Sequence, residues 1–275
     1  MNLLITGGNG NIAKMIKQNL SNEFNIDVIT RDNFDLLDYD SLKEYFKNRS
    51  YDILIHTAVV GGRRINEDSS EIVYKNLLML ENLLHFRNKF KYIFNFDSGA
   101  IYDRSTNIYN KREDELSTVP KDFYGFSKYL IYKRIMNDNC IYNFRIFNIF
   151  HVNEEQQRFI KSCFISKKNK QKVTIFNDKF FDFMYEDDFI KVIKYYIENI
   201  NHTFLPKTIN LSYKKKYKLS DIANMIINDP DQIIVQDNIY SFNYCGDGTL
   251  LSCLPIELDG LDVSLQKYEN ELKKI

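Results

Sequence analysis

A glycine-rich turn near the amino end constrains the fold of this chain more than any other feature. The segment Thr-Gly-Gly-Asn-Gly-Asn-Ile-Ala at residues 6–13 follows an apolar run at residues 3–6 and opens a stretch with helical spacing. Glycine lets a backbone turn tightly and approach a phosphate, which the free N–H groups of a helix N-terminus then face. A strand, this turn and a helix together predict a Rossmann fold that binds a dinucleotide. The residues expected to contact its pyrophosphate are Gly7, Gly10, Asn11 and Ile12.

Short apolar runs alternate with helical segments through the first half of the chain. Runs that are apolar on both faces are typical of strands buried between two helix layers. Strands are expected at residues 3–6, 27–30, 53–57, 92–96 and 142–147, with helices at 69–85 and 123–137. Beyond residue 150 we expect strands at 173–176 and 208–211, a helix at 187–199, and a helix capped at Ser220 and Asp221.

This alternation predicts an α/β protein with a doubly wound parallel Rossmann sheet and a smaller C-terminal α/β lobe for substrate. The dinucleotide-binding domain is expected at residues 1–150 and the substrate-binding lobe at residues 151–275. This boundary is approximate, and we expect the two lobes to be interleaved along the chain.

Charge and cysteine content exclude several functional classes. Lys plus Arg and Asp plus Glu number 37 each, so no overall field favours binding to nucleic acid or an anionic membrane. The four cysteines are scattered, without metal-ligand spacing, which favours free thiols in a reducing compartment and no metal site. The chain begins directly with a strand, and no apolar run approaches the roughly 20 residues of a membrane helix. We therefore expect a cytoplasmic protein.

The end of the second strand indicates which dinucleotide is bound. An NAD site usually carries a carboxylate there for the ribose 2′-OH, whereas an NADP site carries an Arg for the 2′-phosphate. Here Arg31 stands at the strand tip, with Asp32 directly after it. The sequence favours NADPH, and a solvated Arg31 is the alternative.

Three residues form a candidate catalytic constellation. Tyr124 and Lys128 are four residues apart, and therefore lie on one face of a helix. Ser98 follows the fourth strand, at the carboxyl edge where doubly wound sheets bind ligands. Tyrosine has an ordinary pKa of about 10, so it needs a neighbouring cation to exchange protons near neutral pH.

With these motifs the chain resembles the extended short-chain dehydrogenase/reductases over nearly its whole length. The resemblance implies that Tyr124 is the general acid/base, that Lys128 binds the nicotinamide ribose, and that Ser98 bonds the reacting oxygen. It also implies a homodimer in which the two helices noted above form a four-helix bundle. Further cofactor contacts implied by the resemblance are Leu37, Asp38, Thr57, Ala58 and Asn76, with Tyr124 and Lys128.

Within that superfamily the chain is most similar to the GDP-L-fucose synthases, which epimerise and then reduce a 4-keto sugar. These enzymes carry a Cys two residues beyond the catalytic Ser and a His at the start of a later helix. Here the first position is Ala100, and the second falls at residues 157–160, where there is no His. His151 lies on the preceding loop and is a less suitable acid. The resemblance therefore implies hydride transfer without epimerisation.

The second half is expected to bind a nucleotide sugar. Residues 181–188 resemble a family stretch whose first residue, an Arg that meets the substrate diphosphate, is Phe181 here. Arg158 or Lys179 could supply that charge instead, and Arg63 and Arg64 lie on a Gly-rich loop that could cover the sugar. The substrate contacts expected overall are Ser98, Gly99, Ala100, Asn148, Arg158 and Lys179.

The sequence thus predicts an NADPH-dependent C4 reductase of a nucleotide-diphospho-4-keto sugar, with a GDP-linked 6-deoxy hexose or heptose as the expected class. Family resemblance adds a role in surface (capsular) polysaccharide precursor synthesis. Two alternatives stay open: an NAD-dependent nucleotide-sugar 4-epimerase and a non-catalytic dinucleotide sensor.

Overall fold

The computed structural model describes residues 1–62, 68–201, 204–236 and 241–274. The chain forms two compact units that interleave along the sequence. The first unit comprises Met1–Arg104, Leu116–Arg145 and Ile193–Ile209. The second unit comprises Ser105–Glu115, Ile146–Val192 and Asn210–Ile275.

A six-stranded sheet with the strand order β10-β6-β4-β3-β1-β2 forms the centre of the first unit. Its strands are β1 (Asn2–Thr6), β2 (Asn25–Ile29), β3 (Tyr51–His56), β4 (Phe90–Ser98), β6 (Ile141–Ile146) and β10 (Thr208–Leu211). β1 pairs in parallel with both β2 and β3, so the strand order reverses at β1. In sheets of this kind ligands bind outside the carboxyl ends of the strands at the reversal point. The predicted α/β Rossmann fold is confirmed, and each strand lies within two residues of its expected position.

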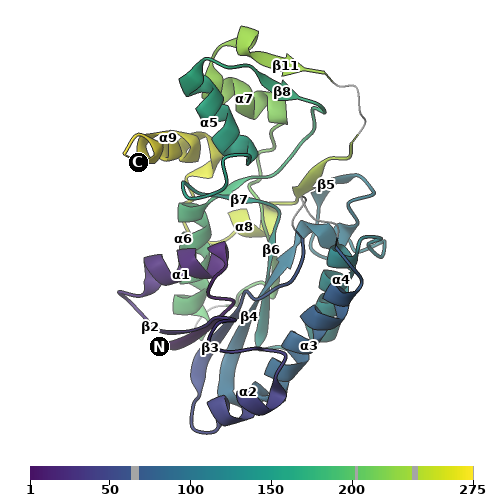
Figure 1. Ribbon diagram of the computed structural model, residues 1–275, viewed down its shortest axis with the longest axis vertical. Coiled ribbons are helices and arrows are strands. Elements are labelled where there is room, and N and C mark those ends of the chain that lie inside the picture. Colours follow the sequence, from purple (N-terminus) through teal and green to yellow (C-terminus); the bar gives the residue numbers. More distant parts are fainter. Residues whose placement is uncertain (63–67, 202–203, 237–240, 275) are drawn as a thin grey trace. The chain divides into compact units, whose positions relative to one another are not determined.

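Helices cover both faces of this sheet (Figure 1). They are α1 (Asn11–Leu20), α2 (Tyr39–Phe46), α3 (Glu71–His85), α4 (Phe123–Ile135) and α6 (Glu186–Asn199). α3 and α4 pack side by side, and their apolar faces meet strand residues such as Leu54 and Ile93 in one buried cluster. On another part of the sheet the Tyr196 ring of α6 packs edge-on against Phe144 of β6, with centroids 4.8 Å apart. Runs that are apolar on both strand faces are explained by these two helix layers.

Among the residues that the structure describes, the second unit contains short parallel strand pairs and several helices. Its strands are β5 (Ile108–Lys111) with β12 (Tyr244–Gly246), β7 (Ile149–Phe150) with β9 (Met184–Tyr185), and β8 (Val173–Ile175) with β11 (Ile233–Val235). Its helices are α5 (Phe159–Asn169), α7 (Leu219–Ile227), α8 (Thr249–Ser252) and α9 (Gly260–Leu272). Short 3-10 turns occur in both units: Arg87–Lys89 (η1) and Gly99–Tyr102 (η2) lie in the first unit, and Pro230–Gln232 (η3) lies in the second.

The start of α7 differs from the expected cap at Ser220. The helix begins at Leu219, and Lys218 is the N-cap. The Asp221 carboxylate accepts a hydrogen bond from the Lys218 backbone N–H at 2.9 Å. The Ser220 hydroxyl instead donates to Asp178 at 2.8 Å, because the Lys218–Asp221 pair already closes this helix end.

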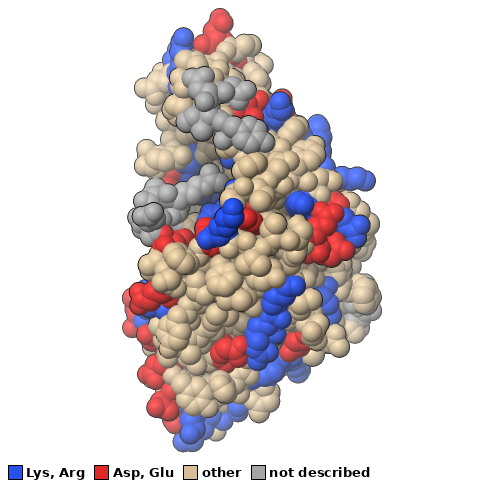
Figure 2. Space-filling model, turned by 90° about the vertical axis from the view of Figure 1, so that its right-hand side faces the viewer, with Lys and Arg blue, Asp and Glu red and all other residues tan. Residues whose placement is uncertain are grey.

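Acidic and basic side chains are interspersed on the face shown in Figure 2. This distribution agrees with equal totals of the two charge types. Within the described part of the chain, no helix is both long enough and apolar enough to cross a membrane.

The Phe46 side chain offers a test of the core. It is fully buried, and its ring lies 5.2 Å from the rings of both Phe86 and Phe90. We expect Phe46→Ala to lower the free energy of unfolding by about 3–5 kcal/mol, because it removes buried apolar area and leaves a cavity. Urea denaturation measures this loss. Met136→Ala, at a side chain that is 45% exposed, is the control and should change stability by less than about 0.5 kcal/mol.

Candidate active site

The glycine turn joins the carboxyl ends of three strands. Gly7 has a φ of +73°, and a Cβ there would lie 2.7 Å from the Ala58 Cα after β3. The Gly8 N–H donates to the Ile29 carbonyl of β2 at 3.0 Å, and a Cβ on Gly8 would overlap the Val28 side chain. Side chains would therefore push the turn out of the sheet edge. Glycine is required here for close backbone packing.

The N-terminus of α1 extends from this turn. Gly10 is the N-cap and no side chain caps the helix, so the N–H groups of Asn11 and Ile12 have no capping partner from a side chain. A helix N-terminus without a side-chain cap, beside a glycine-rich turn, fits a dinucleotide pyrophosphate, because its positive partial charge and N–H groups suit phosphate oxygens.

Arg31 lies directly after β2, with an exposed side chain. The neighbouring Asp32 carboxylate accepts a hydrogen bond from the Asn9 side chain at 2.8 Å. The Asp32 carboxylate is therefore already hydrogen-bonded to the glycine-rich turn, whereas the Arg31 side chain is exposed to solvent. This arrangement suits a 2′-phosphate better than a ribose 2′-hydroxyl.

Two further expected cofactor residues lie at the start of α2. Asp38 is the N-cap, and its carboxylate accepts hydrogen bonds from the backbone N–H groups of Asp40 and Ser41. Hydrogen bonds from the Ser41 side chain and backbone lower the pKa of the Asp38 carboxyl. Leu37 is half-buried against the apolar cluster under α2 and α3. Both residues thus have local structural roles at the helix entry.

The segment after β3 is fastened to its neighbours by three expected site residues. The Thr57 hydroxyl donates to the Thr6 carbonyl at 2.7 Å, and Ala58 packs against Gly7. The buried Asn76 side chain on α3 bonds both the N–H and the carbonyl of Val60, and also donates to the Ser127 hydroxyl of α4. Asn76 therefore acts as a bridge between this segment and the helix that carries Tyr124 and Lys128.

Ser98 ends β4 and caps the 3-10 turn η2. Its hydroxyl accepts a hydrogen bond from the Ala100 N–H at 3.2 Å. Gly99 and Ala100 are buried. A Cβ on Gly125 would lie only 2.6 Å from the Ala100 carbonyl oxygen. The chain after β4 is thus packed directly on the first turn of α4.

The structure brings Tyr124 and Lys128 together. The Lys128 Nζ lies 5.8 Å from the Tyr124 ring centroid and donates to the Phe96 carbonyl of β4 at 2.7 Å. Gly62 packs against the same ring, since a Cβ there would lie 2.7 Å from Tyr124 Cε2. The Arg104 guanidinium lies 5.9 Å from the ring centroid and forms an ion pair with Asp122, the N-cap of α4.

The pKa of Lys128 is unusually low for a lysine. Its side chain is 6% exposed, and burial lowers its pKa to about 8, with the Asp97 carboxylate opposing that shift. Burial, together with the Lys128 charge, also lowers the pKa of His56 to about 3. His56 shares a hydrogen bond of 2.9 Å with the Thr6 hydroxyl through Nδ1. At neutral pH the cluster therefore holds a neutral imidazole and an ammonium group near its threshold of deprotonation.

These residues supply what proton-coupled hydride transfer needs from a protein. A Tyr hydroxyl with a lysine next to it can give a proton to a carbonyl oxygen, and a serine hydroxyl can hydrogen-bond that oxygen. Within the described residues no group of three His, Cys, Asp or Glu could hold a metal ion. The four cysteines are free.

Sequence reasoning assigned no role to Asp97, Arg104 or Arg145, which surround this centre, because their roles depend on contacts between elements that are distant in the sequence. The Gly-rich loop was expected to cover the sugar, and its Gly62 lies against the Tyr124 ring. Arg63 and Arg64 lie outside the described residues.

Two of the expected substrate contacts in the second unit are brought together. The Arg158 guanidinium donates to the Asn148 side chain at 2.5 Å and lies 3.5 Å from the Glu154 carboxylate. Burial raises the pKa of Glu154 to about 7, and the charge of Arg158 opposes this shift. Lys179 lies elsewhere, with its Nζ 5.6 Å from the Phe181 ring centroid.

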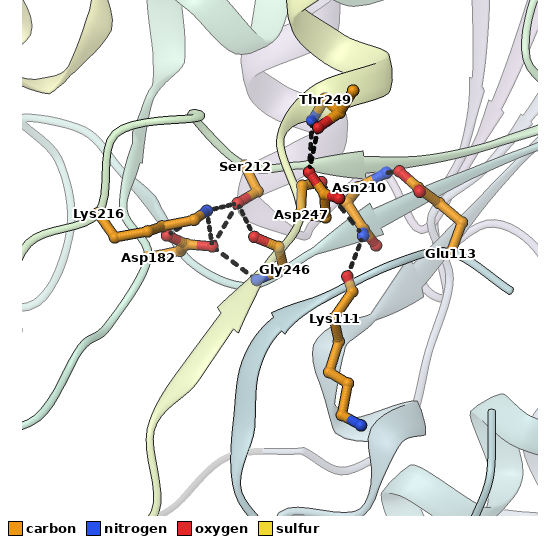
Figure 3. A network of polar contacts seen from close by, with 9 residues as sticks. All are labelled: Lys111, Glu113, Asp182, Asn210, Ser212, Lys216, Gly246, Asp247 and Thr249. Carbon is orange, nitrogen blue, oxygen red and sulfur yellow. Dashed lines mark hydrogen bonds and ion pairs between the residues drawn. The ribbon is translucent and has the colours of Figure 1, made fainter. Parts of the chain in front are cut away.

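Phe181 is part of an aromatic group and not of a charged one. Its ring centroid lies 5.0 Å from that of Phe183 and 5.2 Å from that of Tyr244. The next residue, Asp182, is buried in the polar network of Figure 3, where both its oxygens lie 3.1 Å from Lys216 Nζ. The Asp182 carboxylate also accepts from the Gly246 N–H at 2.8 Å. This network fastens β12 to its surroundings within the second unit.

The burial of Lys128 generates a stability prediction. Because its folded pKa lies below the ordinary 10.5, its charge opposes folding fully below pH 8 and not at all above pH 10.5. We expect Lys128→Met to raise the free energy of unfolding at pH 7 by roughly 1–3 kcal/mol, while removing activity. The gain should shrink as the pH approaches 10.

Urea denaturation at pH 7 and pH 10 measures this effect. Lys133→Met, on the exposed face of the same helix, is the matched control and should leave stability nearly unchanged. If Lys128→Met instead lowers the free energy of unfolding at pH 7, burial of the Lys128 ammonium group does not destabilise the folded protein.

Comparison with known proteins places this geometry in a family. No curated protein sequence matches the chain. Two solved Campylobacter jejuni structures are similar: a GDP-D-glycero-L-gluco-heptose synthase with NADPH (17% identity, TM-score 0.80) and a GDP-mannoheptose C4 reductase with NADP (18% identity, TM-score 0.78). Each covers 100% of this chain and 98% of its own. A UDP-N-acetylglucosamine 4-epimerase from Bacillus cereus covers 99% of both chains at 19% identity and TM-score 0.76.

At these identities the solved structures establish the fold alone. A family model adds evidence at the level of sequence, and it covers most of the chain. The model described as the NAD dependent epimerase/dehydratase family matches residues 3–212, and the chain belongs to this family.

Proposed function

We propose that this protein is an NADPH-dependent C4 reductase of a nucleotide-diphospho-4-keto sugar. The observation that carries the proposal is the grouping of Ser98, Tyr124 and Lys128 around the η2 turn, with Ala100 in place of a proton-exchanging Cys. The proposed substrate class is a GDP-linked 6-deoxy hexose or heptose, because similar folds include a GDP-heptose synthase and a GDP-mannoheptose C4 reductase. The product would serve surface-polysaccharide synthesis in the cytoplasm.

The proposed mechanism divides the work among these three side chains. A bound nicotinamide would supply the hydride that reaches C4 of the sugar. The Tyr124 hydroxyl donates its proton to the C4 oxygen, so that the ketone becomes an alcohol. Ser98 hydrogen-bonds that oxygen, and Lys128 binds the nicotinamide ribose while its positive charge favours ionisation of Tyr124.

Epimerisation requires groups that this chain does not have at the corresponding positions. The Ala100 methyl is buried and cannot exchange a proton. Gln157 and Arg158 occupy the place of the family His before α5. His151 is buried, and its pKa is lowered by burial and by the charges of Arg158 and Lys161, so it is a poor proton donor. We therefore propose that another enzyme makes, and where necessary epimerises, the ketone.

The remaining roles follow from the same proposal. Gly7, Gly10, Asn11 and Ile12 bind the pyrophosphate of NADPH, and Arg31 binds its 2′-phosphate. Arg158 and Asn148 contact the substrate diphosphate in place of the missing Arg at Phe181. The homodimer forms through α3 and α4, whose outer face includes Tyr74, 65% exposed.

A nucleotide-sugar 4-epimerase is the second candidate, since one similar fold has that activity and a 4-epimerase needs little beyond Tyr and Lys. Such an enzyme holds NAD tightly and recycles it. A dinucleotide sensor has no use for an intact Ser98, Tyr124 and Lys128 set.

Turnover in deuterated buffer separates these candidates. A GDP-4-keto-6-deoxy sugar is supplied with NADPH or NADH, with and without a separate 3,5-epimerase, and both cofactor consumption and product labelling are followed. We expect faster NADPH consumption, with deuterium at C3 and C5 only when the epimerase is present. Deuterium at those carbons without it would contradict the absence of epimerase activity. No consumption, with NAD bound to the purified protein, would favour a 4-epimerase.

The choice of cofactor is tested at Arg31. We expect Arg31→Ala to raise the KM for NADPH about tenfold, because it removes one charged contact to the 2′-phosphate, and to leave the KM for NADH nearly unchanged. Arg49→Ala, an exposed Arg on the loop before β3, is the control and should alter neither value. Equal effects on both cofactors would remove Arg31 from the 2′-phosphate site.

A further inference from the structure

A buried ion pair lies directly behind the catalytic turn. The Asp97 and Arg145 side chains are 2% and 0% exposed, and Arg145 Nε lies 2.8 Å from Asp97 Oδ2. Burying an isolated charge is costly, so each group offsets the cost of burying the other. The pair links β4 to β6, which are neighbours in the sheet.

Asp97 fixes the turn that carries Ser98. Its Oδ1 accepts a hydrogen bond of 2.7 Å from the Ser98 N–H, while Oδ2 binds Arg145 and the Asn143 side chain. Asn143 is held in turn by the side chain of Asn95. These three hydrogen bonds of the Asp97 carboxylate therefore run to β6 and to the first residue of the catalytic turn.

Arg145 contacts the two elements that carry the catalytic groups. It donates to the Tyr102 hydroxyl at the end of η2, and its guanidinium lies 4.7 Å from the Tyr102 ring centroid. The guanidinium also lies 5.3 Å from the Tyr132 ring centroid on α4, one turn beyond Lys128. Movement of Arg145 would disturb both η2 and α4.

The same pair sets the charge environment of Lys128. The titratable groups that face Lys128 are His56 from β3, Asp97 from β4 and Tyr124 from its own helix, and Arg145 from β6 neutralises Asp97. Burial alone would drive Lys128 towards its neutral form, and the Asp97 carboxylate opposes this. Burial likewise opposes the charge on Arg145, but Asp97 and Tyr102 raise the pKa of that group above its ordinary value.

We propose that Asp97 and Arg145 are positioning residues of the reaction, which hold the Ser98 turn in place and provide the counter-charge beside Lys128, whose Nζ donates to the carbonyl of Phe96, the residue before Asp97. Neither touches the reacting atoms, and they act through Ser98 and Lys128. The ion pair with Arg145 also holds Asp97 in place, so that Asp97 does not form a direct ion pair with Lys128 that would draw the ammonium group away from the ribose and from Tyr124.

Substitutions of Asp97 and Arg145 should shift the pH at which Lys128 titrates in opposite directions. Asp97→Asn leaves two buried cations without a counter-charge, so the pH at which Lys128 titrates should fall by about one unit. Arg145→Met leaves Asp97 free to favour the charged Lys128, so that pH should rise by about one unit. Arg145→Lys keeps the charge and should restore the parent value. Asp52→Asn, an acid paired with Lys91 near the other end of the same sheet, is the control and should change nothing.

The experiment uses the full chain labelled with ¹³Cε-lysine. The Lys128 resonance is identified by its loss in Lys128→Arg, and its chemical shift is followed with pH by NMR. Circular dichroism confirms that each variant is folded, and each folded variant tests its own sign. Unchanged titration of Lys128 in folded Asp97→Asn or Arg145→Met would overturn the proposal.

Because this inference rests on the proposed reductase, the pH profile of kcat is measured alongside. For Asp97→Asn we expect the basic limb to move to lower pH, with about a fivefold loss of kcat at pH 8, because a one-unit fall in the Lys128 pKa lowers its charged fraction there from about one half to about one tenth. The NMR titration needs no substrate. If Lys128 moves as expected but no nucleotide-sugar ketone is reduced, the proposed function fails while the role of the ion pair is supported.

Discussion

The first unit buries an ammonium group, which is costly, and much of the surrounding structure offsets that cost. Lys128 donates to a strand carbonyl, lies beside a tyrosine ring and has one carboxylate within electrostatic reach. That carboxylate is in turn neutralised by an arginine from the neighbouring strand. The histidine on β3 stays uncharged, so no further positive charge is added. Such an arrangement lowers stability but gives a cation near its point of deprotonation, which is useful for proton transfer at neutral pH.

The sequence predicted the parts of the molecule that depend on local pattern. Strands apolar on both faces, the glycine turn and the Tyr124–Lys128 spacing are each readable within a few residues, and the structure has them where they were expected. The Asp97–Arg145 pair was not predicted, because it depends on which strands are neighbours, and nothing in the spacing of 48 residues indicates that. The Arg104–Asp122 pair beside Tyr124 was missed for the same reason. The N-cap of α7 was expected two residues too late, at Ser220 instead of Lys218, because either residue could precede the apolar helix face.

The second unit shows how a family position can change its physical character. A buried phenylalanine cannot bind phosphate, and Phe181 instead joins the rings of Phe183 and Tyr244. The adjacent Asp182 keeps its charge partner in Lys216 and bonds the backbone of β12. The polar contacts of Asp182 thus hold strands of the second unit together. The Arg158–Asn148 pair before α5 remains as the more suitable place for an anionic ligand.

The interleaving of the two units has a consequence for how the chain reaches its native state. The edge strand β10, at Thr208–Leu211, completes a sheet whose other five strands lie before residue 147. Until that late segment has left the ribosome, the hydrogen-bonding groups along one side of β6 have no strand to pair with, and an open edge of this kind invites pairing with other chains. The edge of the nascent sheet at β6 therefore stays unpaired while more than 60 further residues are synthesised. Neither unit is a continuous stretch of the chain, so the first unit is complete only once residues 193–209 have been synthesised.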